Sequence, residues 1–174
     1  MRNHVSTRAA ITAASVVALS LCSLPSHAEA VRLINKTNDW SLYMHEEGAA
    51  KICFALAQPK DTEPKAIKRG QAYLYVSAWP KDGVKGEVSV RIGYPFKKGS
   101  NATAAVAGIN FTLFTKDDKA FIENPTDELK LIEAMKKGGR MVITGMSERG
   151  TLTVDTYSLA GLGQALQALA TNCQ

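Results

Sequence analysis

Short segments of strand length, separated by turn residues, are the feature of this sequence that most restricts its fold. The segments are rich in β-branched and aromatic residues, which favour extended strands, and they lie at residues 40–45, 52–57, 72–79, 88–94, 103–106, 109–114, 141–147 and 151–157. Glycine turns such as Asp82-Gly83, Lys85-Gly86, Ala107-Gly108 and Glu148-Arg149-Gly150 separate several of them. Turns this short join antiparallel strands, because a parallel connection needs a long crossover. The sequence therefore predicts an antiparallel sheet.

Two segments have helical periodicity instead. The first begins at Asn124, an N-cap residue followed by proline, and ends at Lys136-Lys137-Gly138. Its apolar stripe is Leu129, Ile132 and Met135. The second is expected from Ser158 onward, with the apolar stripe Leu159, Leu162, Leu166, Leu169 and Cys173. The predicted fold class is mainly β (α+β): an antiparallel β-sandwich or partly open barrel with one short internal helix and a C-terminal helix.

The first residues of the chain resemble a secretory signal peptide. Arg2 and Arg8 precede an uncharged stretch from Ala9 to Leu24, and small residues follow at Ala28 and Ala30. This stretch is shorter than the roughly 20 apolar residues of a membrane span. We expect residues 1–28 to be removed, with cleavage after residue 30 as an alternative. Residues 29–174 then form a single exported domain with no transmembrane span.

The cysteine pattern predicts one disulfide bond. Of the three cysteines, Cys22 leaves with the signal peptide, so Cys53 and Cys173 remain. Two cysteines in an oxidising compartment usually pair, and this bond would attach the last helix to an early strand. Two alternatives are weaker: lipid attachment at Cys22, which follows a large residue, and a reactive thiol paired with His45.

The charge distribution permits an anionic ligand. The chain has 21 Lys+Arg and 16 Asp+Glu, for a formal net charge of +5, too mild an excess to indicate a nucleic-acid-binding protein. Cations concentrate in residues 60–98 and include Lys81, Lys85, Lys97 and Lys98. If these loops gather at one end of the sheet, they could bind anionic lipid or a sulfated glycan. The alternative, which we favour, is that they only confer solubility.

One strand places three aromatic residues on the same face. Tyr73, Tyr75 and Trp79 alternate with the apolar residues Ala72, Leu74, Val76 and Ala78. An exposed aromatic face would form a platform for sugar rings or bases. A face covered by a second layer would belong to the interior of a sandwich. We favour burial.

The sequence does not indicate an active site. After signal removal, His45 is the only histidine left for a catalytic triad, and a zinc site would depend on it as well. Ser147 lies in Gly145-Met146-Ser147-Glu148-Arg149-Gly150, one residue too long for a nucleophile elbow. Paired acids such as Glu46-Glu47, Asp117-Asp118 and Asp127-Glu128 adjoin turns, lysines or a helix start. We therefore expect these acids to lie on the solvated surface. We expect no catalytic residue, no metal and no cofactor.

The sequence resembles the bacterial invasion-associated locus B family from about Trp40 to Cys173. The resemblance is carried by residues 51–54, 75–80, 87–95, 131–138 and 156–161. It implies a small exported periplasmic or surface protein, mostly β and without an established enzymatic activity; some members are linked to entry into host cells. Members tied to invasion have a further cysteine pair where this chain has Ala120 to Glu128, so the resemblance implies the fold more than that role.

Three functional hypotheses follow. The first is a non-enzymatic envelope or host-interaction protein of this family, in the periplasm, secreted or on the cell surface of a bacterium, with an unidentified protein or surface partner. The second is a carbohydrate- or polyanion-binding module that uses the candidate surface Tyr73, Tyr75, Trp79, Lys81, Lys85, Lys97 and Lys98. The third is a hydrolase that uses Ser147 or paired acids.

Overall fold

The computed structural model describes residues 31–48 and 50–174. Within them the backbone forms one antiparallel sheet in the order β1-β2-β3-β5-β6-β9-β8-β7-β10-β11-β4. The strands are β1 (Arg32–Thr37), β2 (Trp40–Glu47), β3 (Ala50–Ala57), β4 (Asp61–Glu63), β5 (Tyr73–Trp79), β6 (Val84–Arg91), β7 (Ala102–Val106), β8 (Ile109–Lys116), β9 (Lys119–Phe121), β10 (Arg140–Met146) and β11 (Leu152–Ser158). A 3₁₀ turn, η1 (Pro80–Asp82), and two helices, α1 (Pro125–Lys137) and α2 (Leu162–Asn172), complete the fold.

The predicted signal peptide lies outside the described residues. In the part of the chain that the structure describes, neither helix is long and apolar enough to cross a membrane.

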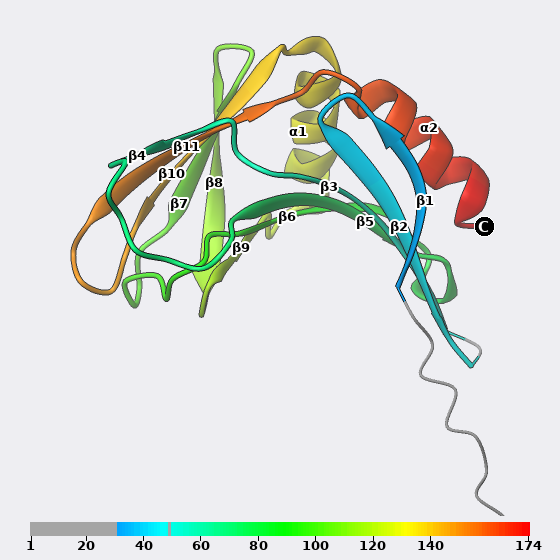
Figure 1. Cartoon of the computed structure of the whole chain (residues 1–174), viewed down its shortest axis with the longest axis horizontal. Helices are drawn as coiled ribbons and strands as arrows, with labels where there is room; N and C mark the ends of the chain where they lie inside the picture. The colour runs from blue at the N-terminus through cyan, green and yellow to red at the C-terminus, as the bar shows by residue number, and fades with distance from the viewer. Residues whose placement is uncertain (1–30, 49) are drawn as a thin grey trace, which may run out of the picture.

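The sheet curls into two halves (Figure 1). β9 pairs with both β6 and β8, so it connects the half containing β1, β2, β3, β5 and β6 to the half containing β8, β7, β10, β11 and β4. Sheets with this many twisted strands seldom stay flat, and here residues of both halves contribute to one apolar core. The predicted fold class, mainly β with an internal and a C-terminal helix, is confirmed.

Alternation along each strand decides which side chains enter the core. Trp40 and Leu42 of β2 and Leu74 and Val76 of β5 are almost completely buried, while the residues between them are only half-buried. α2 contacts β1, β2 and β3, and α1 contacts β6, β7 and β8. Both helices lie on the same side of the arch formed by the first half (Figure 1). The helices therefore complete the core on one face of these strands.

Some strand predictions were wrong in their boundaries. The turn expected at Lys85-Gly86 lies within β6, which begins at Val84 and ends at Arg91 rather than covering residues 88–94. The other turn expected there, Asp82-Gly83, is confirmed, and Gly83 has a positive φ of 71°. β1, β4 and β9 were not predicted, because short or edge strands lack the alternating apolar pattern that marks a half-buried strand.

α1 begins as predicted but buries a different face. The Asn124 side chain caps the helix by accepting a hydrogen bond from the Thr126 amide (2.8 Å). The buried residues are Leu131, Ala134 and Met135, whereas Leu129 is 66% exposed. The predicted stripe was therefore wrong at Leu129. Several faces of this helix carry apolar residues, and the contact with the sheet selects one of them.

α2 starts three residues later than predicted, with its N-cap at Gly161 rather than Ser158. β11 continues through Ser158, and the chain turns at Gly161, whose φ is 92°, before the helix begins at Leu162. A Cβ at Gly161 would lie 2.4 Å from the Thr37 carbonyl oxygen. This position requires glycine both for its left-handed backbone and for the close approach to β1.

The predicted disulfide bond is confirmed. Cys53 of β3 and Cys173, which follows α2, are bonded, with their Cα atoms 5.9 Å apart. Leu162, Ala165 and Leu169 give α2 its buried face, on the same side as Cys173. The bond therefore fixes the end of the chain to the middle of the first half of the sheet.

Candidate functional site

A row of contacting aromatic rings crosses β2, β3 and β5. Ring centroids are 5.6 Å apart for Tyr43 and Phe54, 6.1 Å for Phe54 and Tyr75, and 5.7 Å for Tyr75 and Tyr73. Tyr43 lies directly opposite Phe54 in the register of β2 and β3, so the stacking follows from strand pairing. We call these four residues the aromatic row.

The aromatic row lies on the face of the sheet opposite the core. All four residues are half-buried, while their strand neighbours Leu74 and Val76 point into the core. The expectation that Tyr73, Tyr75 and Trp79 are buried was therefore wrong. The physical reason is that α2 covers only one face of β2 and β3, and the side chains on that face, among them Trp40, Leu42 and Ala55, form the core.

Two hollows border the aromatic row. One, of about 620 Å³, is lined by Tyr43, Tyr73 and Tyr75 together with polar residues that include Ser41 and Gln58. The other, of about 390 Å³, adjoins Phe54, Tyr75, Trp79 and Phe121 and also has polar lining residues. Tyr75 lines both hollows. We call the two hollows together the aromatic groove; it runs across β2, β3, β5, β6 and β9.

Charged side chains of both signs border the aromatic groove. Lys60 forms an ion pair with Asp39 in the first hollow, and hydrogen bonds from Lys60 and Ser158 lower the pKa of the Asp39 carboxyl. Arg91 Nε donates to Asp118 Oδ2 (2.7 Å) at the second hollow. Burial raises the pKa of the Glu87 carboxyl there, and nearby Lys119 opposes that rise. Lys36 also lines the first hollow. The groove thus carries both signs of charge with a small excess of cations, two of which, Lys60 and Arg91, are paired with acids.

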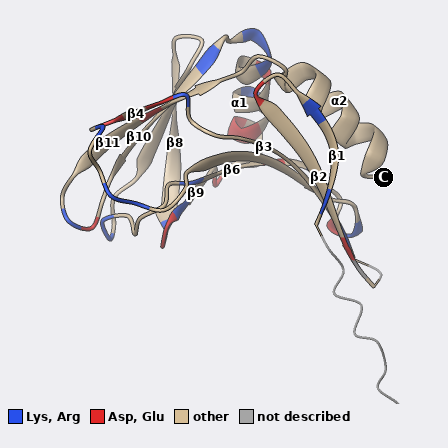
Figure 2. Cartoon of the chain, viewed as in Figure 1, with Lys and Arg blue, Asp and Glu red and all other residues tan. Residues whose placement is uncertain are grey.

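The candidate lysines do not join the aromatic residues. Lys81 lies in η1 and Lys85 near the start of β6, whereas Lys97 and Lys98 follow the end of β6. From Lys85 to Arg91 the strand alone extends roughly 20 Å. None of the four lines the aromatic groove, and Figure 2 shows Lys and Arg spread over several parts of the molecule. The hypothesis that the basic loops gather at one end was therefore wrong, because antiparallel strands separate consecutive loops.

Ser147 is part of a turn. Its side chain is buried, and its Oγ accepts a hydrogen bond from the Thr151 amide (3.0 Å) in the hairpin between β10 and β11. Asp118 and Asp127 pair with Arg91 and Lys130. Among residues 31–48 and 50–174, no group of three or more His, Cys, Asp and Glu side chains is arranged to hold a metal ion.

Comparison with known proteins decides the family. The sequence profile of the invasion associated locus B (IalB) proteins matches residues 40–170. The chain belongs to this family. Comparisons with curated proteins and with solved structures gave no match. In this invasion associated locus B protein, the matched residues include all lining residues of the aromatic groove except Lys36, Asn38 and Asp39. The match ends three residues before Cys173.

The protein also has a buried ion pair, between Arg69 and Asp155, that was not predicted from the sequence. Arg69, in the loop before β5, donates from both terminal nitrogens to Asp155 of β11; the Nη1 to Oδ2 distance is 2.8 Å. Arg69 also donates to the Ile92 carbonyl (3.0 Å) and to Thr62 Oγ1 (3.1 Å). The two charged side chains are 7% and 0% exposed. Arg69 is thus a structural residue rather than part of a basic surface.

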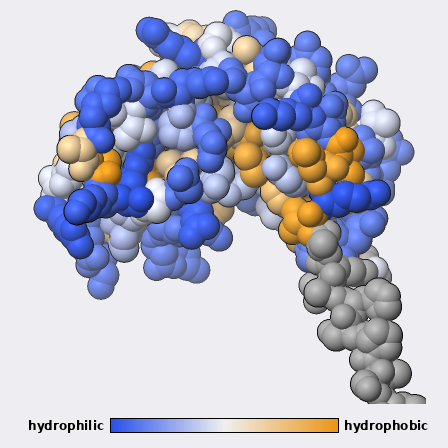
Figure 3. Space-filling view, viewed as in Figure 1, coloured by the Kyte–Doolittle hydropathy of each residue, from blue (hydrophilic) through white to orange (hydrophobic). Residues whose placement is uncertain are grey.

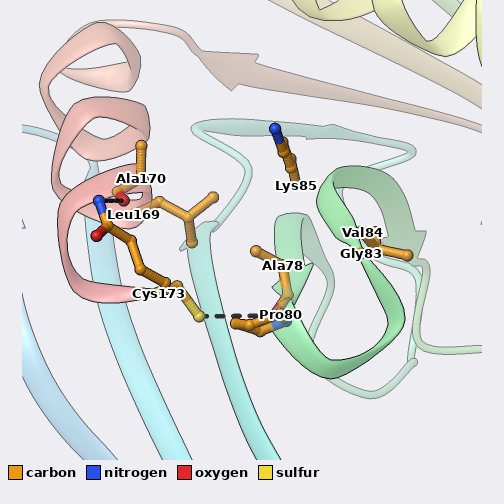
Figure 4. A pocket seen from close by; sticks show the side chains of 9 residues that line it. Ala78, Pro80, Gly83, Val84, Lys85, Leu169, Ala170 and Cys173 are labelled. Atoms are coloured by element: carbon orange, nitrogen blue, oxygen red, sulfur yellow. Dashed lines mark hydrogen bonds between the residues drawn. The ribbon is translucent and has the colours of Figure 1, made fainter.

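An apolar hollow of about 430 Å³ lies beside the disulfide bond (Figure 4). Its walls come from the β5–β6 turn and the end of α2, and Cys173 Sγ lies 3.7 Å from the Ala78 carbonyl oxygen. Lys85 stands at the edge away from Cys173. Apolar side chains also gather on the surface over β1 and β2 (Figure 3), where Val31 and Leu33 are about half exposed. Neither region combines aromatic rings with converging polar groups.

Glu128 caps an open edge of β6. β9 pairs only with Ser89, Val90 and Arg91, and the Val88 amide donates to Glu128 Oε1 of α1 (2.8 Å). Burial raises the pKa of the Glu128 carboxyl, the hydrogen bond from Val88 opposes the rise, and neighbouring Glu87 adds to it. The prediction that Glu128 belongs to a solvated surface was wrong, because nothing in the local sequence indicates that the first turn of α1 meets a sheet edge.

Replacing Glu128 with glutamine is expected to make the protein equally or more stable at about pH 7. The folded-state pKa of Glu128 is raised, so its contribution is present below the unfolded-state pKa and is lost as the pH rises through the folded-state pKa. Glutamine keeps an oxygen acceptor for the Val88 amide and carries no charge. Urea unfolding measured from about pH 4 to about pH 7 should show the advantage of E128Q growing with pH. A variant less stable than wild type at the upper end would contradict this explanation.

Proposed function

We propose that this invasion associated locus B protein is an exported, non-enzymatic protein of the bacterial envelope that works by binding a ligand in its aromatic groove. The observation that carries the proposal is the half-buried aromatic row on the sheet face opposite the core. The signal-like N-terminus and the disulfide bond support export, since such bonds persist mainly in oxidising compartments.

The aromatic row has the physical properties of a binding surface. Aromatic side chains bury a large area when a ligand covers them, and they have few rotamers to lose. Here each ring contacts another, which restricts the rings further. Rigid aromatic anchors surrounded by polar groups are typical of recognition sites. The more specific hypothesis, that the ligand belongs to the surface of a host cell, stays a prediction.

Export is tested by expressing the full chain in a bacterium and measuring the mass and compartment of the product. We expect a periplasmic or released protein that begins after residue 28 or 30 and contains no free thiol. Leu19→Arg, which places a charge in the apolar stretch, should keep the full-length chain in the cytoplasm. A wild-type chain found uncleaved in the cytoplasm would overturn the envelope assignment.

The binding function is tested by co-sedimentation of the purified, oxidised protein with isolated envelope material from the bacterium of origin. We expect Tyr75→Ala to reduce the bound fraction by about tenfold, because Tyr75 borders both hollows. Leu152→Ala, at a residue that is 55% exposed outside the groove, is the control and should bind as wild type. Equal binding by all three proteins would exclude the groove as the working surface.

A further inference from the structure

We infer that the aromatic groove binds an extended, neutral polysaccharide chain, with Tyr75 between two adjoining subsites. The inference rests on the proposed function, because it names the ligand of the same surface. It is carried by three properties of the groove: its length, the alternation of rings with hydrogen-bonding groups, and the balance of its charges.

The length of the groove favours a chain over a compact molecule. The two hollows share Tyr75, and their lining includes residues of β2, β3, β5, β6 and β9. These strands are consecutive neighbours in the sheet. At a strand spacing of about 4.8 Å, the groove spans roughly 20 Å. A polymer that continues from one hollow to the next would use both, whereas a single small ring would fill only one.

The lining matches the two kinds of surface on a sugar. A sugar ring has an apolar C–H face, which packs against an aromatic ring, and an edge of hydroxyl groups, which needs donors and acceptors. Tyr43, Tyr73 and Tyr75 supply rings in the first hollow beside Ser41 and Gln58. Phe54, Trp79 and Phe121 supply rings in the second hollow beside Ser89 and Glu87. Both hollows therefore offer the same combination.

The charge balance favours a neutral chain over a polyanion. Lys36 and Lys60 stand with Asp39 in the first hollow, and Arg91 and Lys119 stand with Glu87 in the second. Lys60 is paired with Asp39 and Arg91 with Asp118, so four cations meet three acids and the excess of positive charge is small. A polyanion would bring like charge against both acids, and the groove has no uniform positive field to compensate. The candidate lysines that would have supplied such a field lie elsewhere. Of the carbohydrate and polyanion alternatives, the structure thus favours carbohydrate.

The groove fits an extended peptide less well. Peptides that bind sheets usually add a strand at an open edge, where backbone groups are free to pair. The groove lies on a face, and β3 and β5 are each paired on both sides. A peptide would have to bind there through side chains alone, without the main-chain hydrogen bonds that give this mode its affinity.

The test measures binding of neutral oligosaccharides of increasing length, built from glucose or from N-acetylglucosamine, by calorimetry and by tryptophan fluorescence. Trp79 lines the groove, while the other tryptophan, Trp40, is fully buried, so a ligand in the groove should change the emission of Trp79. We expect affinity to rise with length until both hollows are filled. Heparin fragments of matched length should bind more weakly.

Variants separate stacking from folding. Tyr75→Ala should weaken binding by about tenfold or more, whereas Tyr75→Phe, which keeps the ring, should retain most of the affinity. Circular dichroism and a thiol assay establish that each variant is folded and oxidised. Affinity for the neutral chain should change little between low and high salt, because no charges are neutralised on binding.

The outcomes distinguish this inference from the proposed function. Failure of every neutral oligosaccharide to bind, or stronger and salt-sensitive binding of heparin, would overturn the polysaccharide assignment. If envelope binding is still lost in Tyr75→Ala, and protease rather than a glycan hydrolase removes the binding partner from the envelope, the groove is a working surface for a protein. Envelope binding unaffected by Tyr75→Ala would reject the surface itself.

Discussion

Replacing Cys53 and Cys173 together with alanine is expected to lower the free energy of unfolding by about 4 to 5 kcal/mol, and less if the reduced unfolded chain stays compact. The bond closes a loop with a sequence separation of 120, so it removes much of the conformational freedom of the unfolded chain. It also anchors α2, a helix with glycine at its start and at Gly163. Glycine lowers helix stability by roughly 1 kcal/mol relative to alanine.

The measurement is urea unfolding of the oxidised wild type and the double variant at equal protein concentration. Reduced wild type is the matched control and should behave like the double variant. Far-ultraviolet circular dichroism at low urea should show early loss of helix in both if α2 detaches first. Equal unfolding midpoints for oxidised and reduced protein would show that packing of Leu162, Ala165 and Leu169 holds α2 without the bond.

Replacing Asp155 with alanine is expected to destabilise the fold by about 3 to 5 kcal/mol. The substitution leaves the Arg69 guanidinium buried without its counter-charge. The same guanidinium donates hydrogen bonds to the Ile92 carbonyl and to Thr62 Oγ1, which its movement would weaken. Burial already raises the pKa of the neighbouring Tyr157 phenol well above its usual range, and Asp155 adds to the rise. Tyr157 therefore stays neutral and cannot replace the lost carboxylate.

A double variant distinguishes the ion pair from simple loss of volume. Arg69→Met with Asp155→Leu removes both charges and should recover much of the stability lost in Asp155→Ala, since a well-packed apolar pair often matches a buried ion pair. Urea midpoints of the three proteins give the comparison. If Asp155→Ala alone unfolds at the wild-type midpoint, the ion pair contributes nothing to the fold.

Local sequence patterns predicted the elements that depend on local physics. Asn124 begins α1 because its side chain caps the first turn, and Ala107 and Gly108 both take positive φ values in the turn between β7 and β8. The disulfide bond was predictable because only two cysteines remain once the predicted signal peptide is set aside. Edge strands such as β1 and β4 were missed, since a strand with one partner and exposed side chains has no apolar alternation to detect.

The candidate site was predicted only in part. Alternation showed that Tyr73 and Tyr75 share one face of β5 and Leu74 and Val76 the other, but two apolar faces of similar character do not reveal which one the helices cover. Tyr43 and Phe54, which come from other strands, were not included because strand pairing brings them there. The lysines were grouped by their closeness in sequence, and the sheet separates them.

By itself, the sequence determined the secondary structure class, the approximate positions of the longer strands and the covalent bond, because these follow from backbone preferences, turn chemistry and cysteine number. Only the tertiary structure decided that Arg69 meets Asp155 across 86 residues, that Glu128 closes the edge of β6, and that the aromatic row is only half-buried. Such contacts join residues far apart in the chain. Packing of the whole core decides which residues meet, and a local segment of the sequence contains only one of the two partners in each contact.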